Sequence, residues 1–264
     1  MALTDHEFAL LQKSIDAIIE RIATLQLSLV VDNDFHGLVR FLQERDTFIY
    51  PSFDPARSTM SGECFWFRLK DIQGATVASH ADRLFETEDF CDLIETGELW
   101  FDDPAPRLGG NIVHVTRPPV PVAGKVGHSG ALWIDKPYRG QGLSLLLPYL
   151  SRSLCLRNFG TDFHTGLVFK NLAESKVPRA YYGYPHVDLC LDGFFPPTAK
   201  PEQVYLCWIS QAEAIERLRA LPKHPEFPVS FGFEPLPTPA TGPIPPQPTA
   251  PLDPMAGLAL APAK

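Results

Sequence analysis

The chain has 264 residues, a net charge of −8 and a sequence pI of about 5.5. Hydrophobic residues make up 45% and charged residues 20%, as in globular proteins with a substantial core. The acidic balance disfavours a nucleic-acid partner, whose affinity depends on basic contacts with phosphate. The N-terminal stretch MALTDHEFALLQKSIDAIIERI has early acids and no uninterrupted apolar run, so we expect neither a secretion signal nor a membrane partner.

The cysteines and histidines show no local pattern of a disulfide framework or a metal site. The five cysteines are Cys64, Cys91, Cys155, Cys190 and Cys207, and none of them forms a CxxC pair. This pattern indicates buried or half-buried thiols in a reducing compartment. We therefore predict a cytoplasmic protein. Cys155 and Cys190 have no histidine beside them in the sequence, which disfavours thiol chemistry. The histidines and acids show no close ligand spacing such as H-E-x-x-H, so no metal is expected.

Two amphipathic segments open the chain. Apolar residues recur at helical spacing from about Asp5 to Leu27, and Thr4 or Asp5 can cap the start of this helix. A second short helix is predicted over residues 34–44. We expect residues 1–45 to form an N-terminal helical segment that packs on the core.

The next elements read as an antiparallel hairpin followed by a helix. CFWFRLKD (64–71) and TVASHADRLF (76–85) predict the two strands, joined by a turn. TEDFCDLIETG predicts a helix that stops at Gly97. Residues 99–126 are rich in loop residues around one short predicted strand, NIVHV (111–115). We interpret this segment as an insertion or a flap on the substrate side.

The second half alternates strands and helices. SGALWI (129–134), DFHTGLVF (162–169), HVDLCLDG (186–193) and EQVYLCWIS (202–210) predict strands. Residues 138–160 predict a helix opened by glycines, and residues 211–221 a closing helix. AESKVPRAYYG is a poor helix because Pro178 lacks a backbone donor. From about Lys223 the composition turns to proline and alanine, which predicts a disordered tail over 223–264 that serves as a spacer or docks on a proline-binding partner.

WIDKPYRGQGLS, residues 133–144, combines features that bind phosphate. A strand that enters a helix through a glycine turn leaves backbone N–H groups free at the positive end of the helix dipole. Gly140 and Gly142 permit close backbone approach, Arg139 adds a charge and Ser144 a hydroxyl. The chain has no P-loop string, and Leu145 occupies the third glycine position of the dinucleotide fingerprint.

The sequence LWIDKPYRGQGLSLLLPYL resembles the acetyl-CoA-binding motif of the GNAT acyltransferases. The pattern [Q/R]-x-x-G-x-[G/A] maps onto Arg139, Gly142 and Ser144, with serine in place of glycine or alanine. GLVFKN and YYGY supply the asparagine and the glycine–aromatic pair that follow in this family. The resemblance covers roughly residues 45–210. It implies a GNAT-like domain over 46–222, of α/β class, with a mixed, mostly antiparallel central sheet flanked by helices.

The resemblance also implies the co-substrate and its contacts. Acetyl-CoA, or another acyl-CoA, would lay its pyrophosphate on the turn and its pantetheine arm along the preceding strand, and an amine would accept the acyl group. The implied cofactor-binding residues are Trp133, Ile134, Arg139, Gly140, Gln141, Gly142, Leu143, Ser144 and Asn171. The acceptor, the acyl chain length and the oligomeric state are left open.

Acyl transfer to an amine needs a base and benefits from an acid for the leaving thiolate. His128, before the cofactor turn, is the first candidate base, and His164 in the neighbouring strand is the second. The family's usual acid position falls on Arg179, with Tyr181 and Tyr182 near but out of register. These tyrosines are either the acid or core aromatics. Two alternatives to an enzyme therefore stay open: a non-catalytic acyl-CoA-binding module, and an interaction protein that works through its proline-rich tail.

Overall fold

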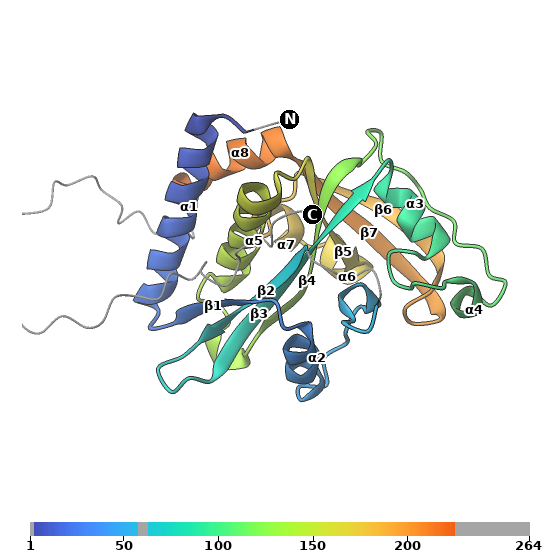
Figure 1. Cartoon of the computed structure of the whole chain (residues 1–264), viewed down its shortest axis with the longest axis horizontal. Coiled ribbons are helices and arrows are strands. Elements are labelled where there is room, and N and C mark those ends of the chain that lie inside the picture. Colours follow the sequence, from blue (N-terminus) through green and yellow to red (C-terminus); the bar gives the residue numbers. More distant parts are fainter. Residues whose placement is uncertain (1–2, 58–62, 225–264) are drawn as a thin grey trace, which may run out of the picture.

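The computed structural model describes residues 3–57 and 63–224 (Figure 1). The predicted tail lies almost entirely outside the described residues, and the division at residues 45 and 222 stays a prediction. In the described ranges, no helix is both long enough and apolar enough to span a membrane.

One seven-stranded sheet forms the centre of the molecule, in the order β1-β2-β3-β4-β5-β7-β6. Neighbouring strands are antiparallel except β4 and β5, which are parallel. The strands are β1 Ser28–Asp32, β2 Cys64–Lys70, β3 Thr76–Thr87, β4 Gly124–Ile134, β5 Phe163–Phe169, β6 His186–Phe195 and β7 Lys200–Ser210. The predicted fold class, a mixed and mostly antiparallel sheet flanked by helices, is confirmed.

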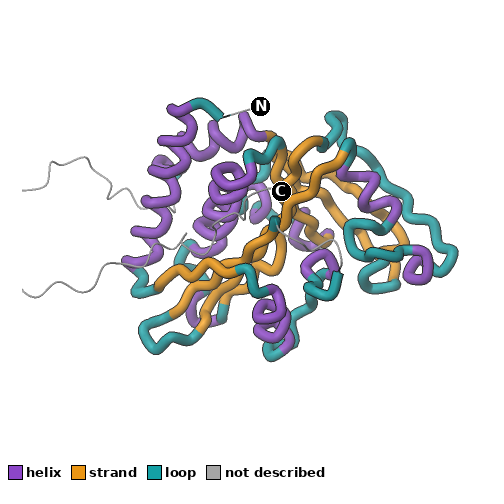
Figure 2. Tube along the Cα trace, in the orientation of Figure 1, coloured by secondary structure: helices purple, strands orange, loops and turns teal. Residues whose placement is uncertain are grey.

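Helices cover both faces of this sheet (Figure 2). On one face α1, α5 and α8 pack against the strands, and on the other face α2 and α3 do so. The helices are α1 Asp5–Thr24, α2 Phe35–Gln43, α3 Phe90–Thr96, α4 Ala105–Leu108, α5 Leu143–Phe159, α6 Lys170–Ala173, α7 Val177–Ala180 and α8 Gln211–Ala220. Helix α5 is buried over nearly its whole length, because α1 covers the side that faces away from the sheet.

The structure corrects two expectations about the first half of the chain. The N-terminal segment is not purely helical, because SLVVD forms the edge strand β1 and pairs with β2. The predicted strand at 111–115 is absent: only Val115 pairs, in an isolated bridge with Leu191. Arg117 is followed by two prolines without an N–H donor, which explains why no ladder continues there.

The segment after β5 contains two short helices. The poor helix predicted across Pro178 is split into α6 and α7, each of four residues. Proline takes the first turn of α7, where its missing N–H costs least.

The candidate site lies where the pairing between β4 and β5 ends. β4 pairs with β3 along its length, but it pairs with β5 only from Val126 to Ser129. A bulge follows in β4, where the register with β3 shifts and Ala131 has a φ of 53°. From Gly130 to Ile134, the β4 edge that faces β5 therefore has no strand partner among residues 3–57 and 63–224, and an extended ligand can add to such an edge.

Candidate functional site

The turn after β4 leads directly into α5. Gly140 and Gly142 have φ values of 75° and 82°, in the left-handed region where glycine is favoured. Gly142 is the N-cap of α5, and no side chain caps the helix. The first N–H groups of this 17-residue helix thus remain available at the positive end of its dipole.

Two hollows meet at this turn. The first, of about 540 Å³, is called the phosphate hollow here and is lined by Arg21, Gly140, Gln141, Gly142, Ser144, Lys176, Val177 and Tyr181. The second, of about 370 Å³, is called the strand hollow and is lined by Leu132, Trp133, Ile134, Tyr138, Arg139, Gly140, Leu143, Ser144 and Tyr182. Gly140 and Ser144 line both, so the turn joins the two hollows into one surface.

The phosphate hollow contains two basic residues that the motif does not supply. Arg21 comes from the last turn of α1, and Lys176 directly precedes α7. Neither position carries a local sequence signal, because both reach the turn only through the packing of α1 and α7 around α5. Arg139, the basic residue of the motif, lines the strand hollow and donates through Nε to the carbonyl of Ile134 at 3.0 Å.

The structure brings together eight of the nine predicted cofactor-binding residues around these hollows. Asn171 is the exception: it is exposed on α6 and lines neither hollow. Leu132 and Tyr138 join the set. Neither was predicted from the sequence, although both lie in the motif LWIDKPYRGQGLSLLLPYL.

The two candidate acids separate between the hollows. Tyr181 lines the phosphate hollow, with Lys176 Nζ 5.8 Å from its ring centroid. Tyr182 lines the strand hollow beside the free edge of β4. Burial raises the pKa of Tyr182 to about 12, so its hydroxyl stays protonated at neutral pH. Arg179, at the family's usual acid position, instead donates to the carbonyl of Val187.

His128 is enclosed on the face of the sheet that α2 and α3 cover, opposite the face that α5 covers. Phe53 stacks on it, with the ring centroids 5.9 Å apart, and Phe85 and Phe90 pack around it. Its side chain is 3% exposed, and burial lowers its pKa to about 3. Nδ1 lies 3.1 Å from the hydroxyl of Thr165. This neutral histidine lines neither hollow.

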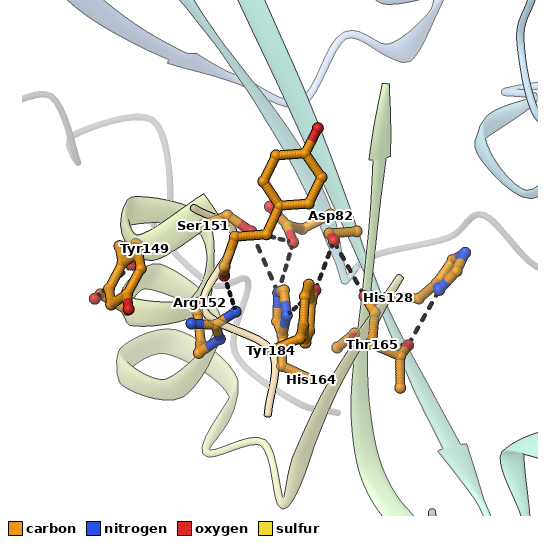
Figure 3. A network of polar contacts seen from close by, with 12 residues as sticks. Asp82, His128, Tyr149, Ser151, Arg152, His164, Thr165 and Tyr184 are labelled. Atoms are coloured by element: carbon orange, nitrogen blue, oxygen red, sulfur yellow. Dashed lines mark hydrogen bonds and ion pairs between the residues drawn. The ribbon is translucent and has the colours of Figure 1, made fainter. Parts of the chain in front are cut away.

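His164 belongs to a buried polar network on the α5 face (Figure 3). Its Nε2 lies 3.1 Å from Asp82 Oδ1 and 3.2 Å from the hydroxyl of Ser151, which also donates to Asp82. Its Nδ1 lies 2.9 Å from the hydroxyl of Tyr184. Tyr184 in turn is 3.2 Å from Ser129 Oγ, at the last paired position of β4.

Comparisons with known proteins identify structural neighbours only. No family model matches the chain, and no curated protein sequence matches it. Similar solved structures include a variant of the spermidine N-acetyltransferase SpeG from Vibrio cholerae, with 12% identity and a TM-score of 0.44 over 73% of this chain and 98% of that chain. FdhC, described as a nucleotide-linked sugar GNAT, has 9% identity and a TM-score of 0.40 over 75% and 94%.

A third neighbour is NAA60 of Arabidopsis thaliana, solved with a bisubstrate analogue. It has 12% identity and a TM-score of 0.40 over 70% of this chain and 97% of that chain. Of these neighbours, SpeG is described as an N-acetyltransferase and FdhC as a member of the GNAT family, which the sequence resembles. Similarity at these identities and TM-scores concerns the fold alone.

Proposed function

We propose that this chain is an acyl-CoA-dependent N-acyltransferase of the GNAT type, which transfers an acyl group, most simply acetyl, from CoA to an amine. One observation carries the proposal: the phosphate hollow at the start of α5 is joined, at Gly140 and Ser144, to a strand hollow along β4. This pair of hollows suits a ligand with a charged phosphate end and a long, thin amide-containing arm.

The proposed pose follows from the two hollows. The pyrophosphate would lie against the N–H groups of the turn, with Arg21 and Lys176 supplying positive charge. The pantetheine arm would extend β4 at the edge that β5 leaves free, between Leu132 and Ile134. The thioester would then lie near the point where β4 and β5 separate.

Tyr182 is the proposed acid for the leaving thiolate. Tyr138 and Tyr182 both line the strand hollow, but the hydroxyl of Tyr138 already donates to Asp71 Oδ2 at 3.2 Å, so Tyr182 is the better candidate. His128 and His164 are both enclosed and line neither hollow. This geometry favours water over either histidine as the first acceptor of the proton that leaves the amine. We propose that both histidines stabilise the fold.

The test of the binding site is calorimetric titration with acetyl-CoA and CoA. The wild type is expected to bind with a micromolar Kd. Because a charge-assisted hydrogen bond contributes about 1.5–3 kcal/mol, Arg21→Ala and Lys176→Ala should each weaken binding by about tenfold or more. The matched control is Lys13→Ala, which removes the same type of charge from the same helix as Arg21 but outside the phosphate hollow.

Two results would contradict the proposal. If the wild type binds neither acetyl-CoA nor CoA nor a longer acyl-CoA, the turn is only a strand-to-helix connection. If binding occurs but Lys13→Ala weakens it as much as Arg21→Ala does, the phosphate groups lie elsewhere on the surface.

The main alternative is an acyl-CoA-binding module without turnover. The position of Tyr182 in the strand hollow favours the enzyme. Release of free CoA thiol from acetyl-CoA in the presence of a panel of amines separates the two: binding without release for every amine would favour the module.

A further inference from the structure

A second cluster of reactive side chains lies in the core, away from the two hollows. Asp82 from β3, Cys155 from α5 and His164 from β5 each present one ligand atom, and these atoms lie within 4.8 Å of one another. All three side chains are buried. Asp82 Oδ1 and His164 Nε2 are already only 3.1 Å apart (Figure 3).

A glycine on the strand between them makes this convergence possible. β4 separates β3 from β5, and Gly127 lies directly beside His164 in the sheet. A Cβ at position 127 would lie 3.1 Å from His164 Cδ2 and 3.3 Å from Cys155 Sγ. Those contacts are too close for a side chain without displacement, so Gly127 leaves space for the two groups above the sheet.

Several buried polar atoms at this cluster have no hydrogen-bond partner in the described structure. They are Asp82 Oδ2, both ring nitrogens of His80, and Nε and Nη1 of Arg152. His80 is two residues before Asp82 on β3, so both side chains point to the same face of the sheet. His80 is 3% exposed and Asp82 is fully buried. Buried polar groups are normally satisfied, and such a group points to an unseen water or ion.

We propose that Asp82, Cys155 and His164 bind a divalent transition metal, with Zn²⁺ the best match, and that the imidazole of His80, which lies outside the present 4.8 Å cluster, turns towards the ion as the fourth ligand. One thiolate, two imidazoles and one carboxylate are ligands that Zn²⁺ takes in tetrahedral sites. Ligand bonds of about 2.0–2.3 Å place neighbouring ligand atoms closer together than the present upper separation, so Asp82, Cys155 and His164 need only a small contraction, whereas His80 needs a larger side-chain movement. Binding releases the thiol proton of Cys155 to solvent.

Neighbouring side chains affect metal binding at this site in two opposite ways. Tyr184 at His164 Nδ1 and Ser151 at Asp82 Oδ1 would hold the two ligands in orientation. Arg152, also fully buried, adds a positive charge nearby, and its Nη2 donates to the carbonyl of Tyr182. The thiolate and the carboxylate together neutralise the ion, so Arg152 remains as the one uncompensated charge.

The experiment measures metal content on the full-length protein. Elemental analysis after purification without chelator, or after Zn²⁺ is returned to chelator-treated protein, should find about one zinc per chain. Co²⁺ in its place should give a tetrahedral d–d spectrum with thiolate-to-cobalt charge transfer. Cys155→Ser and Asp82→Asn should lose the bound metal, and Tyr184→Phe should weaken it about 10–100-fold.

The matched control is Cys207→Ser, which changes another buried thiol on the same side of the sheet but outside the cluster. It should retain metal and the cobalt spectrum. Wild-type protein that takes up neither Zn²⁺ nor Co²⁺ overturns the proposal, whether or not the variants fold. Metal retained in folded Asp82→Asn and Cys155→Ser, as in Cys207→Ser, overturns it as well.

Discussion

Tyr182 shows how a single side chain connects the sequence to a proposed role. Counting along the family motif puts it out of register, because the acid position falls on Arg179. The break between α6 and α7 changes the direction of the chain, and Tyr182 enters the strand hollow while Arg179 bonds to β6. Counting residues along a helix therefore does not locate the acid where a proline divides that helix.

Tyr182→Phe is expected to lower kcat about a hundredfold, because the ring still packs but the leaving thiolate loses its proton donor. The Kd for CoA should stay within about twofold, since the hydroxyl is proposed to act on the thiolate, not to hold the ligand. Steady-state kinetics and calorimetry measure the two quantities. Tyr205→Phe on β7, outside both hollows, is the control. An unchanged kcat in Tyr182→Phe would remove this residue from the mechanism.

His128 makes the folded state sensitive to acid. An unfolded chain protonates this histidine near pH 6.5, whereas the folded protein, with a pKa of about 3, leaves it neutral. Its contribution to stability is therefore complete above about pH 6.5 and is lost as the pH falls towards 3.

His128→Gln tests this linkage. Urea unfolding at about pH 7.5 and about pH 5 should show that the variant loses about 2 kcal/mol less stability between the two pH values than the wild type does. Equal losses in both proteins would mean that His128 is protonated inside the fold.

At the scale of elements, α5 is the element on which both proposed sites depend. Its N-terminal turn borders the two hollows, and its middle supplies Cys155 and Ser151 to the buried cluster. Its sequence predicts the helix, and a glycine marks each of its ends. The contacts made by its buried side chains, by contrast, depend on which strands lie beneath it.

The two glycines at the ends of α5 allow a matched comparison. Gly142 has a φ of 82° and Gly160 a φ of 63°, so alanine at either position costs about 1–2 kcal/mol of stability. Both variants should lower Tm to a similar extent. Only Gly142→Ala should also weaken CoA binding, because only that end lines the phosphate hollow. Equal Kd values for the two variants would contradict the proposed pose.

At the scale of the whole molecule, the N-terminal segment belongs to the same sheet and the same site as the rest. α1 covers α5 and brings Arg21 to the phosphate hollow, and β1 extends the sheet through β2. The N-terminal segment, expected from the sequence to be helical and to pack on the core, also adds a strand to the central sheet.

The proline-rich tail gives a test at this scale. Removing the chain after His224 should leave Tm and CoA binding unchanged, because the described residues that line the two hollows all precede it in the chain. Thermal unfolding and calorimetry of the truncated chain check this. A loss of CoA binding would show that the tail contributes to the site, and loss of a binding partner alone would favour the adaptor alternative.

The sequence by itself determined the strands with strong alternation, the capped helices and the glycine turn before α5, because those features depend on residues close together in the chain. Tertiary structure decided which distant groups meet. β1 has no strong local pattern and gains its pairing from β2. Cys155 has no histidine beside it in the sequence, yet His164 lies beside it across Gly127. Arg21 joins the phosphate turn, and His128 is enclosed by aromatic rings, only because the sheet brings these segments together.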